Sequence, residues 1–143
     1  RVHENYRDAV LPPIEQRPVV FITHMEHHSN QTSWLETLCE VRVIPQTEDG
    51  LVDLEGLDAL LAEYRERPVK IASVTSCSNV TGIITPYHEI ARRMHAAGGL
   101  CFVDFAASAP YIDIDMHPKD IPGGDLDAIF FSPHKFLGGP GSS

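Results

Sequence analysis

Residues 100–108 read LCFVDFAAS, and this stretch decides the fold class. The apolar run at 100–103 is short and follows Gly98 and Gly99, which is typical of a strand that comes directly after a helix. A strand with no polar residue before its last position is covered on both faces, which happens mainly in parallel sheets flanked by helices. We therefore expect an α/β fold in which Asp104 closes an interior strand.

Four further apolar runs surround this stretch, at residues 19–23, 41–44, 69–74 and 128–131. Segments with helical periodicity separate them, at about residues 29–38, 54–64 and 86–97. This alternation is typical of βαβ units and predicts a three-layer α/β/α arrangement around a mainly parallel sheet. The runs with the fewest polar residues are the first and the last two, so we expect these three strands in the interior of the sheet.

Each expected helix has its own start signal. Ser29 and Asp53 are N-cap residue types, and Thr85 followed by Pro86 combines a cap with a first-turn proline. Gly98 supplies a left-handed stop for the third helix. The side chains expected to form the buried stripes are Trp34, Leu35 and Leu38, then Leu54, Leu57, Leu60, Leu61 and Tyr64, then Ile90, Met94 and Ala97.

The composition narrows the classes of function. The chain has 143 residues, enough for one domain, and its 20 acidic and 11 basic residues give a formal net charge of −9. Negative charge spread along the chain argues against nucleic acid or an anionic membrane as a partner. No apolar run approaches the roughly 20 residues of a membrane-spanning helix. The three cysteines form neither a CxxC motif nor an even disulfide set, so we expect a cytoplasmic protein that binds small molecules.

The two ends of the chain differ from its middle. Residues 1–17 are polar and interrupted by proline, so we expect a lead-in segment at 1–17 and a single domain at 18–143. No repeat or Gly/Ser linker divides that domain. The last residues, GGPGSS at 138–143, read as a turn that leads onward, which indicates a piece of a longer protein.

Three histidines follow the first predicted strand, at positions 24, 27 and 28. His24 and His28 would share a helix face, so a zinc hydrolase is one alternative, although the HExxH order is absent. Solvated loop histidines are a second alternative. The third is an imidazole that lines a ligand pocket, and this is the interpretation that the other motifs favour. We predict no metal site.

Small polar residues follow the third predicted strand, in TSCSNVTG at 75–82. Taken alone, this segment is typical of a turn. Cys77 has no neighbour that plainly stabilises a thiolate, so we expect it to be inert. Cys39 and Cys101 lie in apolar stretches and are expected to fill the core.

Asp104 and Lys135 are charged residues near the ends of the last two predicted strands. A carboxylate in this position needs a cation, a metal or a hydrogen-bond donor, and a helix cap or an internal ion pair is the structural alternative. Lys135 lies between apolar residues at the mouth of the sheet, so we expect partial desolvation that leaves a free amine nucleophilic toward carbonyls. Taken alone, it reads equally as a surface lysine.

In combination, these groups meet the needs of pyridoxal 5′-phosphate, because ligands of parallel sheets bind beyond the carboxyl ends of the strands. Lys135 would form a Schiff base with the aldehyde of the cofactor. Asp104 would keep the pyridine nitrogen protonated, and a histidine would stack on the ring. Small hydroxyl groups and imidazole N–H groups would hold the phosphate.

The chain resembles the large, cofactor-binding domain of the class-V aminotransferases, and it is most similar to their cysteine desulfurase and selenocysteine lyase branch. Four motifs carry the resemblance: MEHHSN at 25–30, SNVTG at 78–82, VD at 103–104 and SPHK at 132–135. Their order and spacing agree over about residues 18–141. The resemblance implies the fold of the pyridoxal-phosphate transferases, with Lys135 as the Schiff-base lysine, Asp104 at the pyridine nitrogen, His27 on the ring, Asn79 at the ring hydroxyl, and Ser132 and His134 at the phosphate.

The resemblance also implies a fragment truncated at both ends, without the substrate-binding arginine and the mobile catalytic cysteine of the desulfurases. Desulfurases usually place a glutamine three residues after the aspartate, where this chain has Ala107. The implied parent is a homodimeric enzyme that acts on an amino acid, by C–S cleavage or by amino-group transfer. We expect the isolated chain to be inactive, because catalysis also requires the substrate to be held in place. The alternative is a non-catalytic structural or interaction domain that retains the fold.

Overall fold

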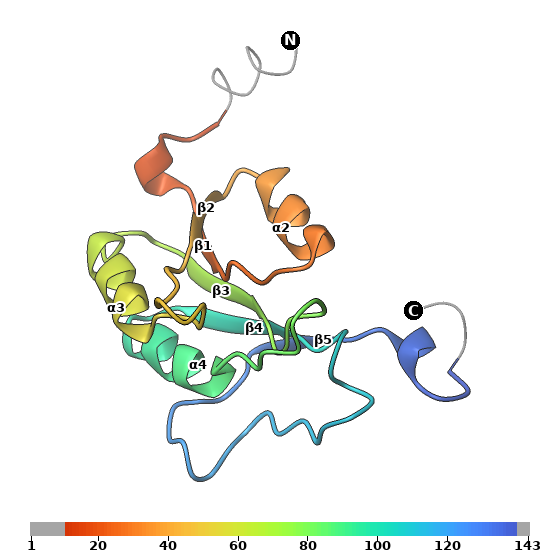
Figure 1. Cartoon of the computed structure of the whole chain (residues 1–143). Coiled ribbons are helices and arrows are strands. Elements are labelled where there is room, and N and C mark those ends of the chain that lie inside the picture. The colour runs from red at the N-terminus through yellow and green to blue at the C-terminus, as the bar shows by residue number, and fades with distance from the viewer. Residues whose placement is uncertain (1–10, 140–143) are drawn as a thin grey trace, which may run out of the picture.

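A five-stranded parallel sheet forms the centre of the molecule (Figure 1). The computed structural model describes residues 11–139, so parts of the expected lead-in segment (residues 1–10) and of the final turn (residues 140–143) lie outside the described residues. The strand order is β2-β1-β3-β4-β5. The strands are β1 (Val19–Ile22), β2 (Glu40–Val43), β3 (Lys70–Thr75), β4 (Leu100–Asp104) and β5 (Ala128–Phe130). All five predicted strands are confirmed to within one residue at each end.

Helices cover both faces of this sheet, as predicted (Figure 1). The connection from β1 leads to β2 on one side of β1, whereas the next two connections lead back across the sheet, to β3 and then to β4 on the other side. Right-handed crossovers therefore place α2 (His28–Leu35) on one face and α3 (Leu54–Glu63) and α4 (Tyr87–Ala96) on the other. Two short 3-10 turns, η1 (Ile14–Gln16) and η2 (Pro133–Lys135), flank the sheet region. No helix in the described part of the chain is long and apolar enough to span a membrane.

The start of α3 and the end of α4 follow the local sequence signals. The carboxylate of Asp53 accepts a hydrogen bond from the Glu55 N–H at 3.0 Å, which confirms the predicted cap. Gly98 has a φ of +71° and ends α4, as expected for a left-handed stop. Ile90 and Met94 on α4 are fully buried. These two helices therefore bury the faces that their periodicity predicts.

Three predictions about helix starts and stripes are wrong. His27, and not Ser29, is the N-cap of α2, because the imidazole Nδ1 accepts from the Ser29 N–H. Thr85 does not cap α4: its backbone N–H is bound to the Ser76 carbonyl at 2.9 Å, and Pro86 takes the cap position without a side-chain hydrogen bond. The predicted stripe on α2 is not buried, since Leu35 and Leu38 are 50% and 42% exposed and no residue of α2 is buried.

The edges of the sheet also differ from the prediction. β1 and β4 are interior strands, but β5 is the edge strand of the described sheet, and Phe130 on it is 54% exposed. A short apolar run does not reveal whether another strand lies beside it, so the sequence alone did not distinguish the two cases. Cys101 is fully buried as expected, whereas Cys39 is only half-buried and is not a core residue.

The core lies between the sheet and the α3–α4 layer. Every residue of β1 is buried, and so are Leu57 on α3 and Phe105 after β4. The chain from 105 to 127 joins β4 to β5 without a helix, and Ile112, Ile114 and Met116 pack it against the core. Since all five strands are parallel, their carboxyl ends lie at one edge, where the chain leaves β1, β3, β4 and β5.

Candidate active site

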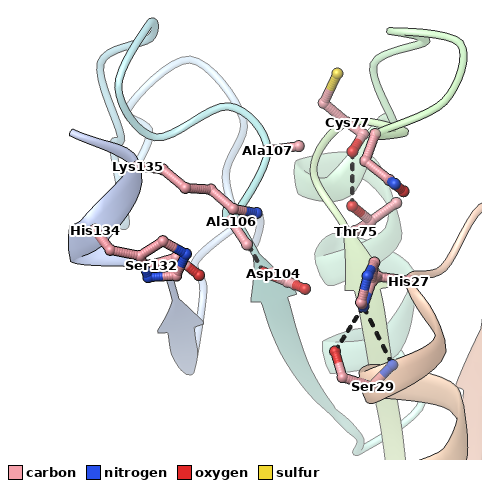
Figure 2. Close-up of a pocket in the computed structure, with 11 residues that line it drawn as sticks. His27, Ser29, Thr75, Cys77, Asp104, Ala106, Ala107, Ser132, His134 and Lys135 are labelled. Atoms are coloured by element: carbon pink, nitrogen blue, oxygen red, sulfur yellow. Dashed lines mark hydrogen bonds between the residues drawn. The ribbon is translucent and has the colours of Figure 1, made fainter. Parts of the chain in front are cut away.

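A cavity of about 320 Å³ opens at the carboxyl ends of the strands (Figure 2). Its walls come from the segments that follow β1, β3, β4 and β5, which are far apart in the sequence. All six predicted site residues line it: His27, Asn79, Asp104, Ser132, His134 and Lys135. The other lining residues are Ser29, Thr75, Cys77, Ala106 and Ala107. The parallel topology therefore brings together the motifs that the sequence analysis singled out.

Asp104 lies at the end of β4, in the middle of the cavity wall (Figure 2). Its Oδ1 accepts a hydrogen bond from the Ala106 N–H at 2.8 Å, which fixes the orientation of the carboxylate. No lysine or arginine among residues 11–139 forms an ion pair with it, so the internal ion pair considered above is absent from the described part of the chain. Oδ2 keeps its capacity to accept a hydrogen bond from a bound molecule.

Lys135 lies on η2 and reaches toward Asp104 from the opposite side of the cavity (Figure 2). Figure 2 shows the side chain of Lys135 pointing into the cavity that Asp104 also lines. The predicted partial desolvation of Lys135 is wrong for this structure, because the residue is exposed.

Ser132 and His134 flank the same turn as Lys135. Ser132 occupies the N-cap position of η2, but its hydroxyl group makes no capping hydrogen bond. Both polar side chains line the cavity, so they are available to a polar or anionic group of a bound molecule.

The loop between β3 and α4 forms another wall. The Ser78 hydroxyl accepts hydrogen bonds from the Val80 and Thr81 N–H groups, which folds the tip of the loop into a turn. The Thr75 hydroxyl donates to the Cys77 carbonyl at 2.8 Å. These bonds place Asn79 and Cys77 at the cavity, so the turn expected from TSCSNVTG is present and also lines the site.

His27 contributes its imidazole from the start of α2. Nδ1 lies 3.2 Å from the Ser29 backbone nitrogen and 2.8 Å from the Ser29 hydroxyl oxygen. His24 has different surroundings, because its Nε2 lies 3.0 Å from the Gly50 carbonyl oxygen. Within residues 11–139, no three His, Cys, Asp or Glu side chains are grouped so that they could hold a metal ion.

A polar network under the site was missed by the sequence analysis. Glu26 Oε1 accepts from the Thr23 hydroxyl at 2.6 Å and from the Thr75 N–H at 2.9 Å, while Oε2 accepts from the Asn30 amide at 2.8 Å. Burial raises the pKa of Glu26 above its ordinary value of 4.5, and these hydrogen bonds offset only part of that effect. The sequence did contain a signal for this network, because Glu26 is an acid four residues after the buried strand β1. The prediction for this segment considered only the histidines.

Comparison with protein families gives one match that spans most of the chain. The model of the family described as aminotransferase class-V matches residues 3–143. A cysteine desulfurase from Enterobacter sp. strain 638 is 38% identical over 127 residues, and one from Haloferax volcanii is 35% identical over 126 residues. These alignments each cover 85% of this chain. The chain spans only 29% and 28% of the length of these two relatives, respectively.

Solved structures give the same result for the fold. A NifS-like protein from Rickettsia africae superposes with a TM-score of 0.72 at 27% identity, covering 90% of this chain and 33% of that protein. The cysteine desulfurase CsdA from Escherichia coli superposes with a TM-score of 0.63 at 28% identity, covering 91% of this chain and 31% of that protein. The expected α/β architecture is thus the architecture of these proteins.

Proposed function

Because the chain belongs to the class-V aminotransferase family, we propose that it forms the pyridoxal-phosphate-binding part of a longer enzyme that acts on an amino acid. Cysteine desulfurase-like C–S cleavage is the first candidate reaction, since relatives that are 35–38% identical to the chain are named cysteine desulfurases. The observation that carries the proposal is the convergence of Asp104 and Lys135 on one cavity.

The cavity fits such a cofactor in size and in chemistry. Its volume of about 320 Å³ lies within the range of about 300–1,000 Å³ that is typical of small-molecule sites. It offers an amine on one side, a carboxylate in the middle of its wall, and a hydroxyl and an imidazole next to the amine. A phosphorylated pyridine aldehyde has an acceptor for each of these donors and a ring nitrogen for the carboxylate.

Each residue has a defined task in this proposal. Asp104 would accept a hydrogen bond from the protonated ring nitrogen through Oδ2, while the Ala106 N–H holds Oδ1 in place. Lys135 Nζ would hold the cofactor at its aldehyde carbon and, once the substrate amine replaces it there, would be free to carry protons to and from the substrate. When bound, pyridoxal phosphate supplies an electron sink for the pair released as a bond to the amino acid breaks.

The other polar groups bind and orient the cofactor. We assign Ser132 and His134 to the phosphate as hydrogen-bond donors, because both line the cavity next to Lys135. Asn79 is assigned to the ring hydroxyl, and His27 to the face of the ring. These roles come from the resemblance of the motifs, and the common location of the residues at one cavity supports them.

Amino-group transfer is the second candidate reaction. Ala107 lines the cavity at the position where desulfurases usually carry a glutamine, and its methyl group supplies no hydrogen bond to the ring oxygen. The parent enzyme is proposed to be a homodimer. A cytoplasmic location stays a prediction, supported by three cysteines that are all free in the described structure.

Borohydride trapping tests the proposal directly. The chain is incubated with pyridoxal 5′-phosphate, reduced with borohydride, digested, and mapped by mass spectrometry. We expect the label on Lys135, no stable label in Lys135→Ala, and normal labelling in Lys119→Ala, which changes an exposed lysine outside the cavity. Labelling spread over surface lysines, or unchanged labelling in Lys135→Ala, overturns the assignment.

The same experiment separates the enzyme from the non-catalytic alternative. A ligand that binds only the native state must raise the melting temperature. If the protein that contains this chain shows neither trapping at Lys135 nor a raised melting temperature with the cofactor, it is a structural or interaction domain that retains the fold.

A further inference from the structure

The hydrogen bonds of His27 define which of its two ring nitrogens carries the proton. Nδ1 lies 3.2 Å from the Ser29 backbone nitrogen, in the geometry of a helix cap. A backbone N–H only donates, so Nδ1 must accept and must be unprotonated. The Ser29 hydroxyl, 2.8 Å from the same nitrogen, can donate to it as well.

A neutral imidazole with an unprotonated Nδ1 carries its proton on Nε2. Nε2 of His27 has no hydrogen-bond partner among residues 11–139, and the ring lines the cavity. Figure 2 shows the Nδ1 side of the ring facing Ser29. The free N–H is therefore available to a molecule in the cavity.

We propose that Ser29 is a positioning residue whose backbone N–H holds His27 in its Nε2-protonated form, so that the ring presents an N–H donor and not a lone pair to the cavity. A molecule bound there can place a hydrogen-bond acceptor against Nε2. His27 then cannot take a proton at Nε2 in the resting site.

Side chains on both sides of His27 are hydrogen-bonded to the sheet, and these bonds fix the position of the segment that carries the ring. On one side, Glu26 accepts from the Thr75 N–H of β3. On the other, the Asn30 amide donates to the Ser73 carbonyl at 3.1 Å, and the Ser73 hydroxyl donates back to Asn30 Oδ1 at 2.8 Å. The segment that holds His27 and Ser29 is thus anchored at two points to β3.

The tautomer is a property of this chain alone, and only the identity of the bound molecule rests on the proposed function. The test therefore uses no cofactor: nitrogen NMR of the chain labelled with 15N at histidine, at about pH 8, where an ordinary histidine is neutral. We expect a pyridine-type resonance for Nδ1 of His27 and a pyrrole-type resonance for Nε2. A protonated Nδ1 overturns the proposal, whether or not the cofactor binds.

A variant of Ser29 separates the role of its backbone N–H from that of its hydroxyl. The hydroxyl can donate to an unprotonated Nδ1 or accept from a protonated one, so Ser29→Ala, which keeps the N–H, should retain the Nε2-protonated form of His27. Ser33→Ala is the matched control, because the Ser33 hydroxyl bonds to the Ser29 carbonyl within α2 and not to the imidazole. A pyrrole-type Nδ1 resonance for His27 in Ser29→Ala overturns the role of the N–H.

Discussion

Replacing Glu26 with glutamine turns one carboxylate oxygen, which accepts hydrogen bonds, into an amide group, which donates them. The carboxylate of Glu26 is surrounded by hydrogen-bond donors. Oε1 accepts from Thr23 and from the Thr75 N–H, and Oε2 accepts from the Asn30 amide at 2.8 Å. If the glutamine oxygen takes the place of Oε1, its amide nitrogen faces the Asn30 amide nitrogen, donor against donor. Asn30 cannot reverse its amide, because its Oδ1 already accepts from Ser73 and Trp34.

The expected cost follows from this one mismatch. A polar group left unsatisfied inside a protein costs about 1–3 kcal/mol, so Glu26→Gln should lower the free energy of unfolding by about that amount at pH 7. Urea unfolding followed by circular dichroism measures this difference. Glu48→Gln removes an exposed carboxylate and is the control, for which we expect a change near zero. A Glu26→Gln variant as stable as the wild type would refute the network as a stabilising anchor.

The same variant has a pH signature. The pKa of Glu26 is raised in the folded state above its ordinary value of 4.5, chiefly by burial, so the folded chain holds this proton to higher pH than the unfolded chain does. Protonation of Glu26 therefore stabilises the folded chain, and this contribution to the free energy of unfolding is fully present below pH 4.5 and is lost as pH rises through the folded pKa. Glu26→Gln should remove this component, and an unchanged slope of stability against pH would contradict the assignment.

Three further predictions concern the rest of the fold. Leu57→Ala empties a fully buried position on α3 and should lower the free energy of unfolding by about 2–5 kcal/mol in urea titrations, and a loss below 1 kcal/mol would contradict the packing of α3. Burial alone lowers the pKa of His95, but its hydrogen bonds to Asp127 and to the Gly123 carbonyl outweigh this effect and raise the pKa above 6.5. Protonated His95 therefore stabilises the fold below pH 6.5, and this stability is lost as the pH rises through the folded pKa. His95→Phe should abolish this pH dependence of the melting temperature. Burial raises the pKa of the Cys101 thiol to about 12, so Cys101 should react with a thiol reagent only on unfolding. Early labelling of Cys101 in the folded chain would refute this.

Local signals in the sequence predicted most of the fold. Asp53, Gly98 and the leucines of α3 determine the ends and the buried face of their helices through contacts within a few residues. The burial of α2 and of β5 depends on segments that do not adjoin them in the sequence, so the periodicity of Leu35 and the apolarity of Phe130 could not reveal their exposure.

The meeting of the six residues at one cavity was predictable, because the carboxyl ends of parallel strands lie at one edge of the sheet. Once Asp104 and Lys135 were placed after neighbouring strands, their meeting at one edge was expected. The exposure of Lys135 and the cap made by His27 were not predictable, since they depend on which segments cover the cavity and on the rotamer of one imidazole. The role of Glu26 needed the three-dimensional contact with Thr75 of β3.

The central claim is that Asp104 and Lys135 hold the two ends of one cofactor ring. The most direct test is a crystal structure of the protein that contains this chain, grown with pyridoxal 5′-phosphate. The account predicts the ring nitrogen within hydrogen-bond distance of the Asp104 carboxylate and the aldehyde carbon bonded to Lys135 Nζ. A cofactor bound through another lysine, or with its ring nitrogen away from Asp104, would contradict it.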